Sequence, residues 1–306
     1  FLLPDEPPED HDLMFKPLIK IENGDYCLMH WSSSAPAFYE ALATDLRNAR
    51  KGKTVDKSIG DNLEEFVRRL LSSDGRKCYD GNYYSGLGRN GQVDAIVETS
   101  DSILLFEVKK KALTRGARAG HPVKVVLDLV KTQLRSMEQL TRAAASLEET
   151  GQLTLMDLAG KSESVIIESR GRIIKRICVS LDSFGAFHTR AITEKFLEFV
   201  YTTGFGVRDQ QFKKDIDEIN KKAMCFREAQ IRLSEASNER YRWPFRDCLF
   251  IALPHLLYIL DDVSDEDSLD HALSLTLYMD LGTRDFYHEY DRAKAVRPRP
   301  QATDKP

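Results

Sequence analysis

Apolar and polar positions alternate in two short runs near the middle of the chain. The runs cover 92–98 and 104–109, and turn-forming residues join them. Alternation with a period of two in β-branched segments is typical of strands, so the pattern predicts a β-hairpin. Successive side chains of a strand point to opposite faces, so Glu107 and Lys109 share one side. Asp94 on the neighbouring strand can lie on that same side.

Helical periodicity dominates the chain on both sides of this hairpin. Apolar residues recur every three or four positions, which predicts amphipathic helices. The predicted helices cover 37–49, 60–71, 123–147, 194–202, 210–240, 244–260 and 269–293. Two further hairpins are predicted at the turn dipeptides Asn23-Gly24 and Arg170-Gly171. Mixed strands and helices up to about residue 185 favour an α/β fold, and the pattern beyond it favours an added C-terminal helical domain.

Length and composition set the outer limits of this organisation. A chain of 306 residues makes one large domain or two ordinary ones. The predicted parts are an N-terminal arm with a hairpin and helix (1–58), a core (59–185), a helical domain (186–296) and a polar tail (297–306). A hydrophobic fraction of 42% and a charged fraction of 30% describe a soluble globular protein. No apolar run approaches the roughly 20 residues that span a bilayer, so no membrane association is expected.

Cysteine, histidine and glycine patterns exclude several other kinds of site. The five cysteines are far apart and form no CxxC pair, which argues against a disulfide framework or structural zinc and favours a reducing cytoplasm. The histidines form no HExxH motif. Residues 86–91 match GxGxxG by letter, but a strand follows them where a dinucleotide site needs a helix. We interpret them as a glycine-rich loop that enters a strand.

The acidic and basic residues of the central hairpin form a known pattern. Asp94, followed after twelve residues by Glu107-Val108-Lys109, resembles the core motif of the PD-(D/E)xK nuclease superfamily. This resemblance implies the restriction-endonuclease-like fold, a mixed central β-sheet flanked by helices. Valine stands at position 93, where the family name has proline. The alternative interpretation is an ordinary surface hairpin with one Asp and a Glu–Lys pair.

Two residues outside the hairpin extend the resemblance to about a quarter of the chain, roughly 59–137. Gly60 and Glu64 resemble the upstream GxxxE element of several branches. Glu64 lies at the edge of the apolar face of its predicted helix, whereas Glu65 points away from it. Gln133 lies on the buried side of a predicted helix and resembles the glutamine that some branches carry. A surface hairpin does not account for these two matches.

The resemblance implies a role for each of these residues. The carboxylates of Asp94 and Glu107 suit Mg²⁺ or Mn²⁺, and in the family the carbonyl between Glu and Lys, here that of Val108, is a further ligand. Lys109 would orient the attacking water or help to deprotonate it. Glu64 would complete a second metal site or bind through water. Gln133 would orient a ligand or a backbone phosphate.

The charge distribution favours a polyanionic substrate next to this site. Formal net charge is −4, but residues 109–142 hold nine Lys or Arg and only two acids. A local basic sector attracts nucleic acid, although a solvated helix face would have the same composition. The candidate phosphate contacts are Lys110, Lys111, Arg115, Arg118 and Lys124. Glycines at 116 and 120 predict that these residues lie on a mobile loop.

The leading hypothesis from the sequence is a Mg²⁺-dependent nuclease that hydrolyses phosphodiester bonds of DNA, with RNA left open. The resemblance alone implies restriction, repair or anti-phage defence as its setting. The alternative is a catalytically silent nuclease fold that binds nucleic acid or serves as a scaffold subunit. A third interpretation is a homodimer or partner protein held by the helical C-terminal half. Its candidate seam is the apolar stripe Phe212, Ile216, Ile219, Ala223, Phe226, Gln230 and Leu233.

Overall fold

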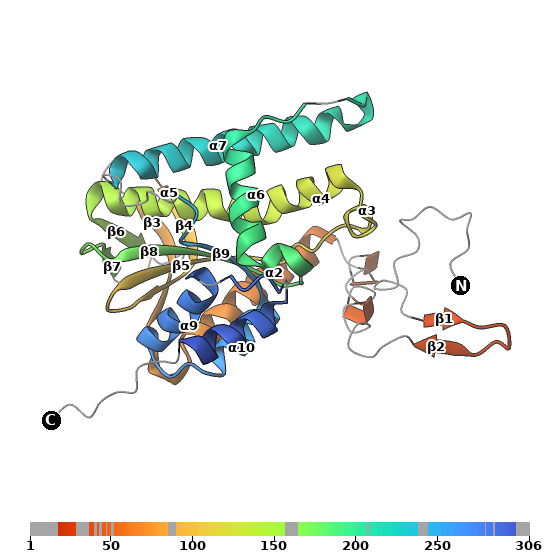
Figure 1. The fold of residues 1–306 in the computed structure, drawn as a ribbon, viewed down its shortest axis with the longest axis horizontal. Coiled ribbons are helices and arrows are strands. Elements are labelled where there is room, and N and C mark those ends of the chain that lie inside the picture. The colour runs from red at the N-terminus through yellow and green to blue at the C-terminus, as the bar shows by residue number, and fades with distance from the viewer. Residues whose placement is uncertain are drawn as a thin grey trace.

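The protein is built around one mixed β-sheet. The computed structural model describes residues 18–28, 37–39, 42, 45–46, 48–49, 52–84, 90–156, 165–206, 208–237, 244–278, 280–283 and 285–297. Seven strands pair in the order β7-β6-β3-β4-β5-β8-β9. Their bounds are β3 (Cys78–Tyr84), β4 (Asn90–Glu98), β5 (Ser102–Lys109), β6 (Gln152–Met156), β7 (Val165–Glu168), β8 (Ile173–Ser180) and β9 (Cys248–Ala252). The expected α/β class with a mixed sheet flanked by helices is confirmed (Figure 1).

Helices cover both faces of the sheet. Over one face lie α3 (Arg115–Arg118), α4 (Pro122–Leu129), η3 (Val130–Leu134), α5 (Arg135–Thr150), α6 (Arg190–Thr202) and α7 (Lys213–Ala236). Over the other lie α2 (Gly52–Leu71), α8 (Leu253–Leu260), α9 (Glu266–Tyr278) and α10 (Phe286–Val296) (Figure 1). The short turns of helix are η2 (Ser73–Gly75), η4 (Gly185–His188) and η5 (Gln210–Phe212). Among the described residues, no helix has both the length and the apolar character needed to cross a bilayer.

The central hairpin forms as the sequence predicts. β4 and β5 pair antiparallel, with Ala95 opposite Phe106 and Glu98 opposite Ile103. Alternate residues of β5 belong to the two hydrophobic cores, Leu105 to the core under α5 and Leu104 to the core under α2. Both faces of β5 are therefore covered, which explains its nearly continuous apolar sequence.

The hairpin predicted at Arg170-Gly171 is wrong. A turn does form there, since both residues have positive φ, 45° and 75°. However, β7 pairs with β6, while β8 lies between β5 and β9 and runs parallel to both. β8 is buried at all positions but its first, and a parallel position inside the sheet covers both of its faces. A turn dipeptide fixes the local bend but does not choose the partner strand.

The helix predicted over 244–260 is also wrong, and with it the expectation of a purely helical C-terminal part. Cys248–Ala252 is the fully buried strand β9, and α8 begins only at Leu253. A short apolar run has no periodicity that separates a buried strand from a buried helix. Pro254 in the first turn of α8 marks the true start of that helix. Residues beyond 186 therefore supply a strand to the central sheet.

The apolar stripe of 210–240 is part of the protein core. In α7, Ile219, Ala223, Phe226 and Leu233 are buried in the same core as the residues of α5. These four residues of the stripe therefore pack within the chain, while Phe212 and Ile216 are only partly buried.

Other predictions are met in part or lie outside the described residues. The Asn23-Gly24 turn joins β1 (Leu18–Lys20) to β2 (Tyr26–Leu28) in an antiparallel pair, with φ of 89° at Gly24. The helix predicted over 123–147 is present as α4, η3 and α5, with a π-helical segment at η3. The described residues of 37–49 are helical, as predicted, whereas residues 86–89, the arm 1–17 and the tail from 298 onward lie outside the described residues.

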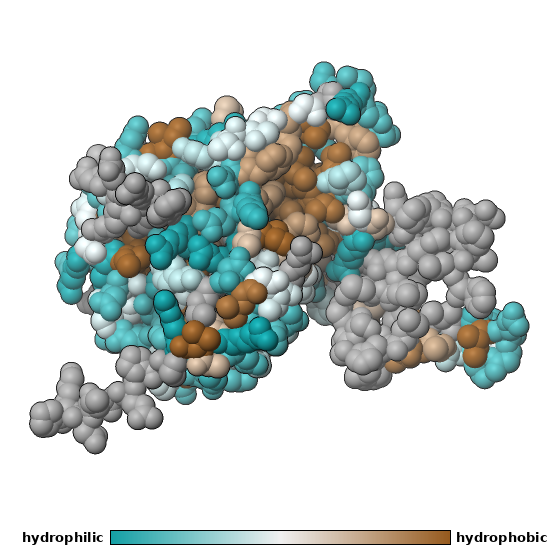
Figure 2. Space-filling model, viewed as in Figure 1, coloured by the Kyte–Doolittle hydropathy of each residue, from teal (hydrophilic) through white to brown (hydrophobic). Residues whose placement is uncertain are grey.

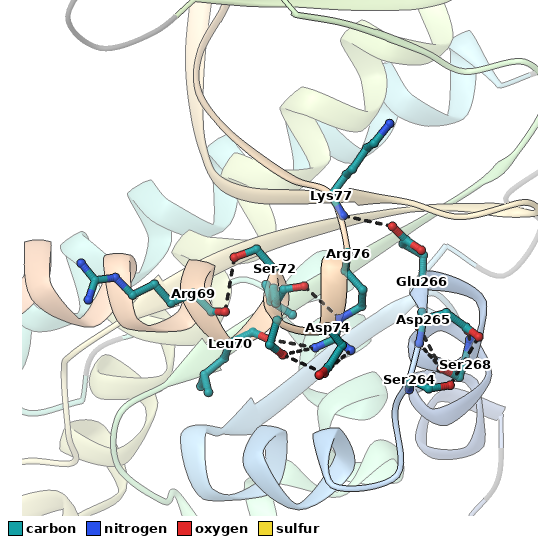
Figure 3. A network of polar contacts seen from close by, with 12 residues as sticks. Arg69, Leu70, Ser72, Asp74, Arg76, Lys77, Ser264, Asp265, Glu266 and Ser268 are labelled. Atoms are coloured by element: carbon teal, nitrogen blue, oxygen red, sulfur yellow. Dashed lines mark hydrogen bonds and ion pairs between the residues drawn. The ribbon is translucent and has the colours of Figure 1, made fainter.

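Polar contacts hold the C-terminal end of α2 in place (Figure 3). The buried guanidinium of Arg76 donates to the carbonyls of Leu71 and Leu70, at 3.0 and 2.9 Å, and so satisfies the open end of the helix. The N–H of Lys77 donates to Glu266 of α9, at 3.0 Å. Because α2 carries Glu64, these contacts help to fix that carboxylate against the sheet.

Candidate active site

The candidate site begins at a bulge in β4. Between Val93 and Ile96, β4 has one more residue than β3 has between Tyr79 and Gly81. An extra residue bends a strand and redirects a side chain. Here the carboxylate of Asp94 accepts the backbone N–H of Val108, at 2.8 Å.

Glu107 and Lys109 follow on the same face of β5, because they are two residues apart in a strand. The Lys109 ammonium donates to Glu107 Oε1. Glu107 is 2% exposed, and its other oxygen, Oε2, is buried without a hydrogen-bond partner. A buried carboxylate oxygen without a donor is costly, and such an atom suits a cation or a ligand group.

Charge and burial shift the titration of all members of this cluster. Burial raises the pKa of Glu107 to about 7, and Asp94 adds to the rise, while the ammonium of Lys109 opposes it. Burial raises the pKa of Asp94, although the hydrogen bond that it accepts from the Val108 N–H lowers it. Burial lowers the pKa of Lys109, but the neighbouring carboxylates outweigh it and the net shift is upward. Shifts of this kind are typical of functional sites.

Glu64 of α2 reaches the same cluster, as its place on the helix predicts. Burial raises its pKa, the charge of Asp94 raises it further, and Lys109 lowers it. Glu65 instead turns to the surface, where it pairs with Arg68 and Arg69 at 2.9 and 2.7 Å. The sequence therefore separates the two neighbouring glutamates correctly.

Two charged residues of the site were not among the predicted ones. Arg68, one helical turn after Glu64, lies 3.1 Å from Asp80 of β3. The charge of Arg68 lowers the pKa of Asp94, and the charge of Asp80 raises it. The spacing of four from Glu64 places Arg68 on the same helix face, so it could have been found in the sequence. Asp80 could not, because its position depends on the bulge in the paired strand.

Gln133 is buried on the π-helical segment η3, on the face predicted for it. It is 0% exposed, and neither its amide nitrogen nor its amide oxygen has a hydrogen-bond partner. Buried amides are normally paired, and short π-helical segments are frequent at functional sites. The Gln133 amide and Glu107 Oε2 are both unsatisfied on the α5 side of the sheet, as are Thr132 Oγ1 in η3 and Gln230 Nε2 in α7.

The predicted phosphate contacts are mostly paired with acids. The ion pairs join Lys110 to Asp56, Lys111 to Asp128 and Lys124 to Asp215, at 3.6, 2.7 and 2.8 Å. Asp128 is 2% exposed, whereas the other two acids lie nearer the surface. Ion pairs near the surface contribute little free energy and exchange readily with other anions.

The loop predicted around these residues is in part a short helix. Residues 115–118 form α3, and Arg118 Nε donates to the carbonyl of Leu113, at 3.2 Å. The N–H and hydroxyl of Thr114 both donate to Asp128, each at 2.7 Å. A loop is therefore present at 110–114, as predicted, but the prediction is wrong at 115–118, where glycine at 116 was taken as a helix breaker and a short helix forms instead.

The oxygen atoms expected to hold a divalent ion converge from two strands. The carbonyl of Lys109 accepts from Leu181, beyond β8, so the N–H and C=O of Val108 face the other side, toward β4. The Val108 carbonyl therefore faces the edge that carries Asp94, and Glu107 offers its unpartnered Oε2. In the described part of the chain, no three Asp, Glu, His or Cys side chains gather closely enough to hold a metal by themselves. Glu64, Asp94 and Glu107 therefore do not gather closely enough to hold the ion by themselves, and the expected set would need the Val108 carbonyl as well.

Comparisons with known proteins found no match to this chain among family models, curated proteins or solved structures. Membership of the PD-(D/E)xK superfamily therefore stays a prediction from the residues themselves.

Proposed function

We propose that this protein is a metal-dependent nuclease that hydrolyses phosphodiester bonds of DNA. One observation supports this most strongly: Glu64, Asp94, Glu107 and Lys109 converge from a helix and two strands around a buried carboxylate oxygen that has no partner. Burying two acids near one lysine, with the half-buried Glu64 beside them, is unfavourable unless a positive ligand binds there.

Asp94, Glu107 and the Val108 carbonyl would hold Mg²⁺ or Mn²⁺, with Glu64 as a further or water-mediated ligand. Such an ion lowers the pKa of a bound water and withdraws charge from phosphate oxygens. In hydrolysis the water oxygen bonds to phosphorus, and the bond from phosphorus to a sugar oxygen breaks. Lys109, charged in this structure, would orient the water and stabilise the phosphate oxygens. Arg68 lies where it would contact a neighbouring phosphate.

Cleavage assays test this proposal directly. Supercoiled plasmid and linear DNA are incubated with Mg²⁺ or Mn²⁺ and wild type, Lys109→Ala or Asp94→Ala. We expect the wild type to cut and both folded variants to be inactive. Nicking of the plasmid would indicate an endonuclease, and trimming of the linear DNA from its ends would indicate an exonuclease. A labelled RNA tests the second substrate. An inactive wild type, or equal cutting by all three proteins, contradicts the proposal.

A second candidate function is a catalytically silent nuclease fold that binds nucleic acid or a partner protein. The apolar surface of the C-terminal half favours it: Phe199 of α6 and Met224 and Ile231 of α7 are about half exposed. Figure 2 shows apolar side chains gathered over the region of these two helices. Nucleic-acid binding without any cleavage even when Mg²⁺ or Mn²⁺ is supplied, or a mass of two chains in solution, would support this candidate.

A further inference from the structure

An open pocket lies beside the candidate active site, where α3 and the start of α4 face η5 and the start of α7. Figure 1 shows these helix ends together at the right of the molecule. The pocket has a volume of about 610 Å³. Pockets of this size enclose a drug-sized ligand. The side chains that decide its chemistry are Lys111, Arg115, His121, Lys124, Lys131 and Phe212.

The cations of this pocket are of two kinds. Lys111 pairs with the buried Asp128, at 2.7 Å, and that acid is also held by Thr114. Lys124 and Lys131 pair with acids of α7, both at 2.8 Å, and all four of these side chains are between 23% and 41% exposed. Exposed pairs are weak, so a phosphate that enters the pocket can replace the α7 acids. The pocket therefore suits an anion.

One wall of the pocket is aromatic. The rings of His121 and Phe212 meet edge to face, with centroids 4.8 Å apart and planes at 61°. Leu127 adds an apolar side chain to the lining. Aromatic faces next to Lys and Arg are the elements with which proteins bind unpaired bases and their phosphates. Together they favour a nucleotide over a plain inorganic anion.

The pocket also lies next to the catalytic cluster. Lys111 lines it, and Lys109 of the cluster is only two residues away along extended chain, roughly 7 Å. We propose that the pocket holds one unpaired nucleotide of the strand that is cleaved, with its base against Phe212 and its phosphate on Lys124 and Lys131. This rests on the proposed nuclease function and names its substrate class: single-stranded nucleic acid, or a duplex end that has opened.

Binding without cleavage tests this assignment. The full chain carrying Lys109→Ala is titrated, without divalent ions, into a fluorescein-labelled oligothymidylate and into a blunt hairpin duplex, and anisotropy is measured. We expect the single strand to bind about tenfold more tightly. Phe212→Ala should weaken single-strand binding about tenfold and leave duplex binding unchanged, because one base–aromatic contact is lost. Phe212→Tyr should restore it.

Matched variants distinguish the pocket from the general surface. Tyr26→Ala removes an exposed aromatic side chain outside the pocket and should change nothing. Lys124→Ala with Lys131→Ala should lower the slope of log Kd against log salt by about 1.4, as two lost phosphate contacts to a single strand require. This second readout remains decisive if Phe212→Ala does not fold.

The outcomes separate this inference from the nuclease proposal. Equal affinity for single strand and duplex, or equal effects of Phe212→Ala and Tyr26→Ala, overturns the pocket assignment even if DNA is cleaved. If the wild type binds the single strand but does not cleave it, the nuclease proposal is overturned instead. Free thymidine monophosphate should compete only weakly with the labelled oligothymidylate. If it binds at micromolar concentration without displacing the oligothymidylate, the pocket belongs to a free nucleotide, and the proposal that it holds a nucleotide of the cleaved strand is overturned.

Discussion

The carboxylate–lysine cluster of β4 and β5 and the histidine pair His188 and His255 are both buried, but their polar atoms differ in whether they find hydrogen-bond partners. His188 accepts the N–H of Phe184 at Nε2, at 2.7 Å, and its Nδ1 lies 3.2 Å from the carbonyl of Phe250. Both ring nitrogens are thus satisfied in the neutral form. Glu107 keeps an oxygen with no partner. Burial alone does not distinguish a functional site, whereas an unsatisfied charge inside a protein does.

The two regions also respond to pH in opposite directions. Burial lowers the pKa of His188 to about 3 and that of His255 to about 4. A histidine with a lowered folded-state pKa stabilises the fold above pH 6.5, and that stability is lost as pH falls. Burial raises the pKa of Glu107 to about 7. Its contribution is fully present below about pH 4.5 and is lost as pH rises through 7.

The largest expected effect concerns activity. Asp94→Asn keeps the shape of the side chain but removes the charge that would bind the ion, so we expect cleavage to fall by about 10³-fold. His255→Phe, in the histidine region, keeps the stacking on Phe286, whose ring lies 4.0 Å away, and should leave the rate unchanged. Initial rates on plasmid DNA at 20 °C compare the two. A comparable loss of rate in His255→Phe would show that the two regions are not independent.

Stability should respond most strongly in the histidine region. His188→Ala leaves the Phe184 N–H and the Phe250 carbonyl without partners and opens a cavity. We expect the free energy of unfolding at pH 7 to fall by about 3 kcal/mol. The free energy of unfolding, measured with urea between pH 4 and 6.5, should also fall less steeply as the pH is lowered (the acid limb). An unchanged acid limb would mean that another group controls acid unfolding.

Removing the charge of Glu107 should instead increase the stability of the fold at high pH. A net rise in pKa from 4.5 to about 7, with the pair to Lys109 already included, corresponds to a cost of about 3 kcal/mol at high pH, and Glu107→Gln also gives up that pair. Glu107→Gln should therefore be about 2 kcal/mol more stable than wild type at pH 8 and no more stable at pH 5. Urea unfolding at the two pH values measures the difference. A variant that is less stable at pH 8 would show that the pair with Lys109 outweighs burial.

The sequence predicted local features of this fold better than the partners of its strands. Alternation located β4 and β5, and helical spacing placed Glu64 and Gln133 on the buried side. It failed for the partners of β8, where Lys175 and Arg176 are buried among apolar residues, and for β9, whose continuous apolar run does not reveal which strand lies beside it. Asp80 joined the site through the bulge of β4, which no local pattern indicates. Likewise, pairing of Lys111 with the buried Asp128 depends on the packing of α4.

The smallest expected effect tests whether Gln133 belongs with the unsatisfied region or with the satisfied one. Both its amide atoms are buried without partners, which costs about 1 to 3 kcal/mol for each unpaired group. Gln133→Met has nearly the same shape and removes this cost, so we expect a gain of about 1 kcal/mol in urea unfolding. If the amide orients a ligand or a phosphate, cleavage should fall about tenfold in the same variant. Gain of stability with loss of activity would place Gln133 in the active site, because a purely structural amide would not improve the fold when removed. Loss of stability would instead show that the amide is already satisfied, and Gln133 would then belong to the core.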